Sequence, residues 1–150
     1  MTASVDFMGC LSQDFVFSID AQGRVAIPAT WRKADAKSVF MLIPGKERTL
    51  QLYPAEVFSE RILPKMKALS AANPDELRKL RQLGSQIFTC ECDKQGRIQL
   101  PAKLQEYAGL QKRAALIGSG DFAQIMTAER WEEEQKAQAA LSDSFLDILG

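Results

Sequence analysis

The chain has 150 residues, 46% of them hydrophobic, and its 19 Lys and Arg residues balance its 19 Asp and Glu residues. This composition is typical of a globular protein with one domain or two small ones, and no apolar run approaches the roughly 18 residues that a membrane span needs. Histidine is absent, which removes the usual partner of a nucleophilic Ser or Cys and the commonest metal ligand, so we expect no catalytic site, no metal and no cofactor.

The first predicted elements are two short strands joined by a tight turn. Residues 16–20 form the first strand. Asp20-Ala-Gln-Gly23 is a turn signature, because the Asp side chain accepts hydrogen bonds from the backbone ahead of it and Gly tolerates positive φ. Val25 and Ile27 then lie on one face of a second strand. Pro28 ends that strand and opens a short helix over residues 28–34.

Two more strands, at residues 39–43 and 50–53, precede a helical connector. Residues 54–70 are predicted to form a helix with a kink at Pro64. A second connector helix begins at Asn73, a residue type suited to capping it. The apolar stripe and the end of this helix are marked by Leu77, Leu80, Leu83 and Gly84.

The second half of the chain repeats this order of elements. A strand at residues 89–93 leads into the turn Asp93-Lys-Gln-Gly96, and a second strand follows. A helix over residues 101–108 ends at Gly109, which is suited to a left-handed C-cap. The later elements are strands at residues 114–117 and 123–126 and a last helix that starts near Thr127. An apolar patch beyond it, which could dock on a neighbouring molecule or on the chain's own body, consists of Phe145, Leu146, Ile148 and Leu149.

The two halves are copies of one unit. A shift of 73 residues aligns residues 15–31 with 88–104 without a gap and gives seven identities in 17 positions, where composition alone predicts about one. The same shift aligns residues 52–58 with 125–131. The identical pairs of the first block are Phe15/Phe88, Asp20/Asp93, Gln22/Gln95, Gly23/Gly96, Arg24/Arg97, Pro28/Pro101 and Ala29/Ala102. Two blocks at one offset indicate a duplication.

Charge and cysteine usage restrict the class of protein further. Residues 1–126 hold 17 Lys and Arg against 13 Asp and Glu, whereas residues 127–150 hold 2 against 6. The mildly basic body makes a weak field, so DNA binding would need clustered cations or several copies acting together. Three sparse cysteines argue against a disulfide framework and indicate the cytoplasm. Cys90 and Cys92 lack a second ligand pair, which favours buried thiols over a zinc site.

The repeated string Asp-x-x-Gly-Arg-(Val/Ile)-x-(Ile/Leu)-Pro-Ala, together with Leu52-Tyr-Pro54 and Asn73-Pro-x-Glu76, resembles the MraZ family over residues 7–135. That family belongs with the AbrB/SpoVT-type swapped-hairpin DNA-binding proteins. The resemblance implies an α+β fold, a tandem duplication of an AbrB-like swapped-hairpin, double-split β-barrel unit with a helical connector and a C-terminal helix. The implied divisions are a SpoVT-AbrB-like unit at 14–59, the connector at 60–86, a second unit at 87–131 and an acidic C-terminal helix and tail at 132–150.

The resemblance also implies a function. The protein would be a sequence-specific transcriptional regulator that binds double-stranded DNA at repeated boxes in the promoter of the division and cell-wall gene cluster. It would act as a homo-oligomeric ring in the cytoplasm, associated with the nucleoid, with no membrane and no small-molecule substrate. The zero net charge keeps open an oligomeric interaction protein of the same fold with weak or no DNA affinity. An enzyme that uses Asp20 and Asp93 as paired acids is disfavoured, since each has a turn to hold.

Several positions depart from the family pattern. Met8 stands where the family has Arg in its opening Phe-Arg-Gly, and Gln22 and Gln95 stand where Lys often precedes Gly-Arg. The first unit keeps the Arg that follows the Pro-Ala helix, but the second unit has Gln105 and Glu106 at that place. These changes leave the fold intact and weaken DNA contacts, chiefly in the second unit.

The candidate DNA contacts are Arg24, Arg32 and Lys33, with Arg97 in second rank. Arg24 and Arg32 can form bidentate contacts with guanine or phosphate. A purely structural role stays open for Arg24 and Arg97, because each can pair with the Asp of its own turn. The residues predicted to build the turns are Asp20, Gly23, Asp93 and Gly96.

Overall fold

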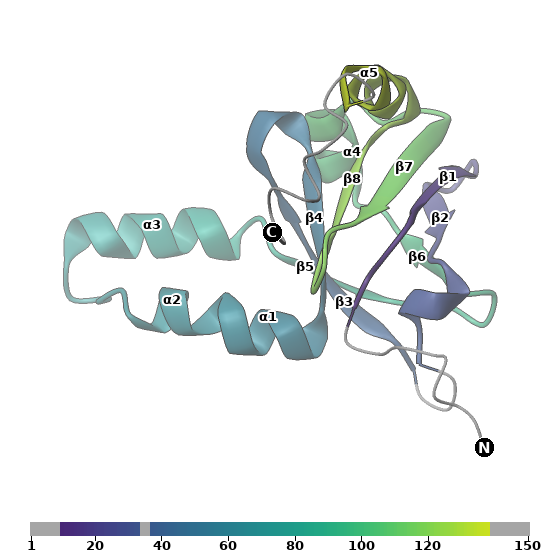
Figure 1. Ribbon diagram of the computed structural model, residues 1–150. Coiled ribbons are helices and arrows are strands. Elements are labelled where there is room, and N and C mark those ends of the chain that lie inside the picture. The colour runs from purple at the N-terminus through teal and green to yellow at the C-terminus, as the bar shows by residue number, and fades with distance from the viewer. Residues whose placement is uncertain (1–9, 34–36, 139–150) are drawn as a thin grey trace, which may run out of the picture.

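Figure 1 shows the computed structural model, which describes residues 10–33 and 37–138. The first half of the chain forms β1 (Asp14–Ser18), β2 (Arg24–Ala26), the 3-10 helix η2 (Ala29–Trp31), β3 (Val39–Pro44), the 3-10 helix η3 (Lys46–Arg48) and β4 (Leu50–Pro54). The helices α1 (Ala55–Arg61), α2 (Leu63–Lys67) and α3 (Pro74–Gly84) follow. The second half forms β5 (Phe88–Glu91), β6 (Arg97–Gln99), α4 (Ala102–Ala108), β7 (Arg113–Gly118), β8 (Ala123–Thr127) and α5 (Ala128–Gln138).

The strands of the two halves share one six-stranded antiparallel sheet, in the order β1-β7-β8-β4-β3-β5, and a separate ribbon of β2 and β6. The edge strand β1 pairs with β7 of the second half, and β5 pairs with β3 of the first. The 73-residue shift converts β2 into β6 and β4 into β8. Equivalent strands of the two halves therefore occupy equivalent places when the sheet is followed inward from its two edges. This arrangement fits the predicted tandem repeat, and the mixture of sheet and helices confirms the α+β class.

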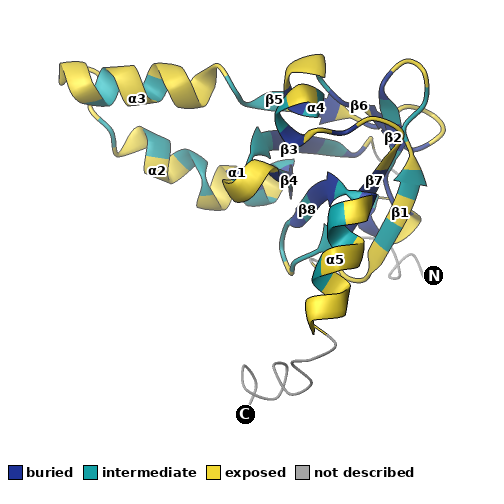
Figure 2. Ribbon diagram, turned by 90° about the horizontal axis from the view of Figure 1, so that it is seen from above, coloured by how far each residue is buried: buried dark blue, intermediate teal, exposed yellow. Residues whose placement is uncertain are grey.

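The core lies between the central strands and the ribbon. Val25 and Ile98, which are opposite each other in the ribbon, are fully buried and belong to one hydrophobic cluster with Leu52 of β4. Figure 2 shows the buried residues concentrated in the strands, while α3 and α5 are largely exposed. Because side chains alternate along a strand, burial of Val25 and Ile98 turns Arg24 and Arg97 to the outer face of the ribbon.

The predicted helix over residues 28–34 is wrong in extent. Only Ala29–Trp31 forms a 3-10 turn, and Arg32 returns to extended backbone with φ −108° and ψ 152°. The Trp31 side chain is buried, and its Nε1 donates to the carbonyl of Ser12 at 3.0 Å. Anchoring this large ring in the core outweighs the helical tendency of the segment. Pro28 precedes the turn in extended conformation, and residues 34–36 lie outside the described part of the chain.

The second copy of this segment does form a helix. It spans Ala102–Ala108, and Gly109 ends it in left-handed conformation with φ 66°, which confirms the predicted C-cap. Pro101 occupies the N-cap rather than the first turn. The last helix also starts where predicted, because the Thr127 hydroxyl accepts a hydrogen bond from the backbone N–H of Arg130 at 3.1 Å.

The connector differs from the prediction in its first half and agrees in its second. Pro54 is the last residue of β4, and the single helix expected over residues 54–70 is two short helices that meet at Ile62. The break falls just before Pro64, whose ring lacks an N–H to donate. Asn73 caps α3 as predicted, since its Oδ1 accepts from the backbone N–H groups of Asp75 at 2.9 Å and Glu76 at 3.2 Å. None of these helices is long and apolar enough to cross a membrane, within the part of the chain that the structure describes.

The cysteines give a simple test of the fold. Cys90 and Cys92 are buried, as predicted, and burial raises the pKa of each thiol to about 11, whereas Cys10 is exposed. Because only the thiolate is reactive, we expect a thiol reagent near neutral pH to label one cysteine per native chain and all three after denaturation. Labelling followed by mass spectrometry measures this, and rapid native labelling of Cys90 or Cys92 would contradict the buried placement.

Candidate nucleic-acid interface

Each repeat holds its turn together with the side chain of one aspartate. Asp20 Oδ1 accepts from the backbone N–H groups of Gln22 at 3.0 Å and Arg24 at 2.8 Å. Its carbonyl accepts from the N–H of Gly23, which has φ 81°. The second repeat has the same geometry, with Asp93 Oδ1 accepting from Gln95 and Arg97 and with Gly96 at φ 77°. Both glycines occupy the left-handed region, where a Cβ would be strained.

The same aspartates orient the two arginines on the outer face of the ribbon. Arg24 Nε donates to Asp20 Oδ2 at 2.9 Å, and Arg97 Nε lies 3.3 Å from Asp93 Oδ2. Arg97 also crosses to the other repeat, where its Nη1 lies 3.2 Å from Asp20 Oδ2. Asp20 therefore holds both guanidinium groups side by side, each about one-third exposed. The Nη groups of Arg24 have no protein partner among the described residues.

Arg32 lies against the turn of the other repeat. Its Nε donates to the carbonyl of Ile27 at 3.1 Å, and its guanidinium covers Gly96, where an added Cβ would come within 2.5 Å of Cζ. Gln105, the equivalent residue of the second repeat, donates in the same way to the carbonyl of Leu100 at 2.8 Å and covers Gly23. Gln105 thus keeps the packing role of Arg32 and lacks only its charge.

Lys33 has a partner on the helical side of the protein. Its ammonium group pairs with the carboxylate of Glu56 on α1, and this hydrogen bond is the main cause of the lowered pKa of Glu56. Both side chains are exposed, so the pair is of the kind that contributes about 1 kcal/mol or less. A phosphate that approaches Lys33 competes with the Glu56 carboxylate for the ammonium group.

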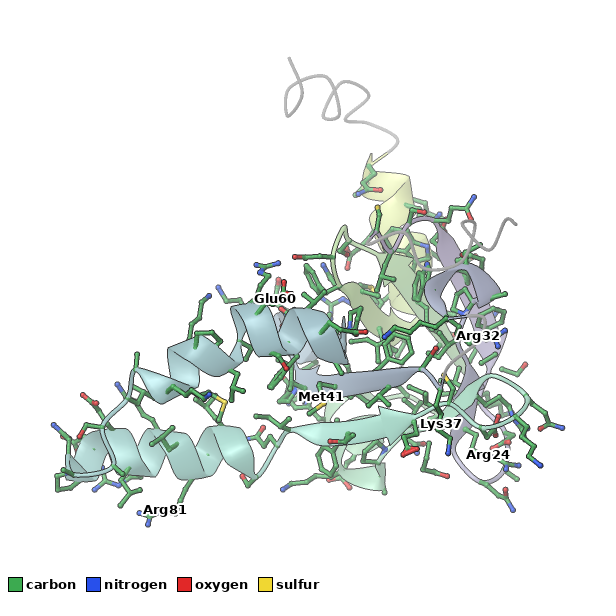
Figure 3. The ribbon with its side chains drawn as sticks, turned by 90° about the horizontal axis from the view of Figure 1, so that it is seen from below. Arg24, Arg32, Lys37, Met41, Glu60 and Arg81 are labelled. Carbon is green, nitrogen blue, oxygen red and sulfur yellow. The ribbon has the colours of Figure 1, made fainter. Side chains whose placement is uncertain are left out.

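Two further polar residues of the ribbon were not singled out from the sequence. Lys94 is exposed in the second turn at the position of Ala21 in the first, and Gln99 is exposed beside Arg24 at the position of Ala26. The alignment of the two halves already shows this difference, because the 73-residue shift pairs Lys94 with Ala21 and Gln99 with Ala26. Lys94 therefore partly makes up for the cation that the second unit lacks at Gln105, the position of Arg32 in the first unit. Figure 3 shows Arg24, Arg32 and Lys37 toward one end of the molecule, opposite Arg81 on α3.

The backbone hydrogen bonds to the turn carboxylates have a consequence for pH. The donated N–H of Arg24 is the largest influence on the pKa of Asp20, and that of Arg97 on the pKa of Asp93, and both pKa values lie below the ordinary value of 3.8. A group with a depressed folded-state pKa stabilises the fold above its unfolded pKa and loses that contribution as the pH falls through the folded one.

We therefore expect the double variant Asp20→Asn, Asp93→Asn to be less stable than the parent near pH 7. The difference should shrink as the pH falls below 3.8. Urea unfolding at a series of pH values measures it, and a difference that stays constant down to about pH 2 would show that ionisation of these carboxylates does not support the turns.

The outer face of the β2–β6 ribbon therefore presents two guanidinium groups close together. A two-stranded antiparallel ribbon fits the major groove of B-DNA, and arginines on its outer face can reach base edges or phosphates. Among residues 10–33 and 37–138, no group of three His, Cys, Asp or Glu side chains is placed to hold a metal ion.

Comparisons with known proteins identify the family. The family model for the MraZ protein, described as antitoxin-like, matches residues 11–82 and again residues 85–146. The Transcriptional regulator MraZ of Corynebacterium urealyticum is 37% identical over 84% of this chain and 87% of its own length. The protein of the same name from Thermomicrobium roseum is 35% identical over 90% and 94% of the two chains, and that of Desulforamulus reducens is 33% identical over 95% and 99%. With a double match to the family model and such coverage of its relatives, this chain belongs to the MraZ family.

Proposed function

We propose that this protein is a sequence-specific transcriptional regulator that reads double-stranded DNA with the outer face of the β2–β6 ribbon. The observation that carries the proposal is the pair of guanidinium groups of Arg24 and Arg97, held side by side by Asp20. A guanidinium whose orientation is set before binding loses less conformational entropy when it contacts a base or phosphate. The relatives are named transcriptional regulators, which supports the same role here.

Within this proposal the four predicted contacts have different tasks. Arg24 and Arg97 reach base edges from the ribbon. Arg32, which lies across Gly96, contacts a phosphate beside the turn, and Lys33 contacts a second phosphate after leaving Glu56. The turn residues Asp20, Gly23, Asp93 and Gly96 hold the arginines in place and do not contact DNA.

The exchange of edge strands supports a finer description of the fold. β1 pairs with β7 and β5 with β3, so each repeat contributes strands to the half built by the other. We propose that this is the swapped-hairpin, double-split β-barrel arrangement, with units at residues 14–59 and 87–131, a connector at 60–86 and an acidic helix and tail at 132–150. The interleaving of strands means that neither unit would fold alone.

The weak net charge supports an assembly of several chains. Each chain carries a formal charge of zero, and the ribbon arginines are partly neutralised by Asp20 and Asp93. A homo-oligomeric ring would present the same surface repeatedly to repeated boxes, so that modest contacts add up. We propose this mode of action at the promoter of the division and cell-wall gene cluster, in the cytoplasm at the nucleoid.

The proposal is tested with DNA from upstream of the protein's own operon. We expect a mobility shift at low salt, with affinity falling by a slope of about −0.9 in log–log terms for each phosphate contacted. A fragment of equal length with the direct repeats scrambled is the control, and light scattering reports the assembly. Failure of the assembled protein to shift the fragment at low salt would overturn the regulator proposal.

One observation favours a second candidate, an oligomeric interaction protein of the same fold with little DNA affinity. The carboxylates of Asp20 and Asp93 lie within 3.3 Å of the arginine nitrogens and compete with phosphate for them. This candidate predicts an intact oligomer and no salt-dependent shift, so the same two measurements separate it from the regulator.

A further inference from the structure

An open apolar groove lies on the side of the molecule away from the ribbon. It has a volume of about 590 Å³ and is bounded by β3, α2 and α3, with Ile43, Met66, Leu69 and Leu83 among its lining residues. Figure 3 shows α2 and α3 extending away from the sheet, at the end opposite Arg24. Leu83 is 46% exposed, although it belongs to the apolar stripe of its helix. Large apolar surface left open in this way marks a docking site.

The rim of the groove is basic. Lys65 and Lys79 line it, and neither forms an ion pair with another described residue. Residues 62–87 hold five Lys and Arg against two Asp and Glu. An occupant of the groove should therefore be apolar on one face and acidic on the other.

The chain contains a segment of that composition beyond α5. Twelve residues, 139–150, follow the last described residue of α5 and carry two acidic side chains and no basic one. Leu141, Phe145, Ile148 and Leu149 recur at the spacing that gives a helix one apolar face, and Asp143 and Asp147 fall on the opposite side of such a helix.

We propose that the C-terminal segment of this chain, residues 139–150, occupies the groove between β3, α2 and α3. Its apolar face packs on Met66, Leu69 and Leu83, and its two carboxylates lie toward Lys65 and Lys79. This is the mode in which an amphipathic segment is held in an apolar groove by side chains one helical turn apart. The proposal concerns a surface separate from the ribbon and does not depend on DNA binding.

Hydrogen exchange of the full-length protein, followed by mass spectrometry, tests the proposal. We expect the backbone N–H groups of residues 139–150 to exchange at least about tenfold more slowly than in the variant Leu83→Glu, because that substitution removes an apolar contact and places a like charge beside the segment. The reciprocal variant Leu149→Glu should speed exchange in α2 and α3.

Val16→Glu is the matched control, because Val16 is a large apolar side chain of equal exposure, 45%, on β1. It should leave the exchange of residues 139–150 unchanged. Circular dichroism verifies that each variant is folded. Unprotected exchange of the segment in the parent protein would overturn the proposal, and so would an equal response to Leu83→Glu and Val16→Glu.

A mixing experiment assigns the docked segment to its own chain or to a neighbouring copy. Chains with Leu83→Glu are unfolded and refolded together with chains carrying Leu149→Glu. If the segment docks on a neighbouring copy, the exchange of residues 139–150 slows again in the mixture. If it docks on its own chain, exchange in the mixture is the sum of the exchange seen for the two variants separately. This assignment applies once Leu83→Glu and Val16→Glu have given different exchange rates for residues 139–150.

Discussion

Replacing Trp31 by alanine is expected to lower the free energy of unfolding by about 3–5 kcal/mol, a large part of the 5–15 kcal/mol typical of a domain. Trp31 is 2% exposed and packs edge-on against Phe15, with ring centroids 5.6 Å apart. Its Nε1 donates to the carbonyl of Ser12, which lies just before β1. Loss of the ring leaves a cavity and removes the anchor between the 3-10 turn and this edge strand. Urea unfolding monitored by circular dichroism measures the change.

The second tryptophan is the control for this prediction. Trp131 is only half-buried on α5, and its Nε1 donates to Asp14 Oδ2 at 2.8 Å. Trp131→Ala should cost less than Trp31→Ala, because less apolar surface is lost from the core. Trp31→Phe should recover part of the loss. Equal effects of the two alanine variants would show that Trp31 does not anchor the core as its burial indicates.

Replacing Arg24 by alanine is expected to weaken binding to the promoter fragment by about tenfold or more, the usual cost of one lost arginine contact to a base. Arg97→Ala should weaken it similarly, because Asp20 holds both guanidinium groups on the same face. Arg24→Lys should not restore the affinity, since an ammonium group cannot form the planar bidentate contact. Mobility-shift titration at fixed salt measures these affinities.

Arg61→Ala is the control for charge alone. Arg61 is also a partly exposed arginine paired with a carboxylate, that of Asp121, but it lies on α1 rather than on the ribbon. It should change DNA binding little. If Arg24→Ala instead dissociates the assembly or unfolds the chain, the arginine is a structural residue of the turn, because an exposed pair should cost no more than about 1 kcal/mol of stability.

The ends of helices were predicted correctly where they depend only on residues close in the sequence. The cap of α3 at Asn73 and the left-handed end of α4 at Gly109 require only contacts within one turn of chain. The helix over residues 28–34 failed for the opposite reason, since the burial of Trp31 depends on Ser12 and Phe15. The break before Pro64 was expected as a kink and is a full interruption, because short helices gain little from propagating across a residue that lacks an N–H.

The duplication, the two aspartate turns and the zero formal net charge can all be predicted from the sequence. Each of these depends on residue identity and spacing alone. The contacts between the two repeats are visible only in the folded chain: Arg97 reaches Asp20, Arg32 covers Gly96 and Gln105 covers Gly23. These contacts join residues more than 60 positions apart, and they exist because β2 pairs with β6 rather than with a strand of its own repeat. The pairing of β2 with β6 depends on the burial of Val25 and Ile98 in a shared core. The residues next to each strand in the sequence do not reveal which strand it pairs with.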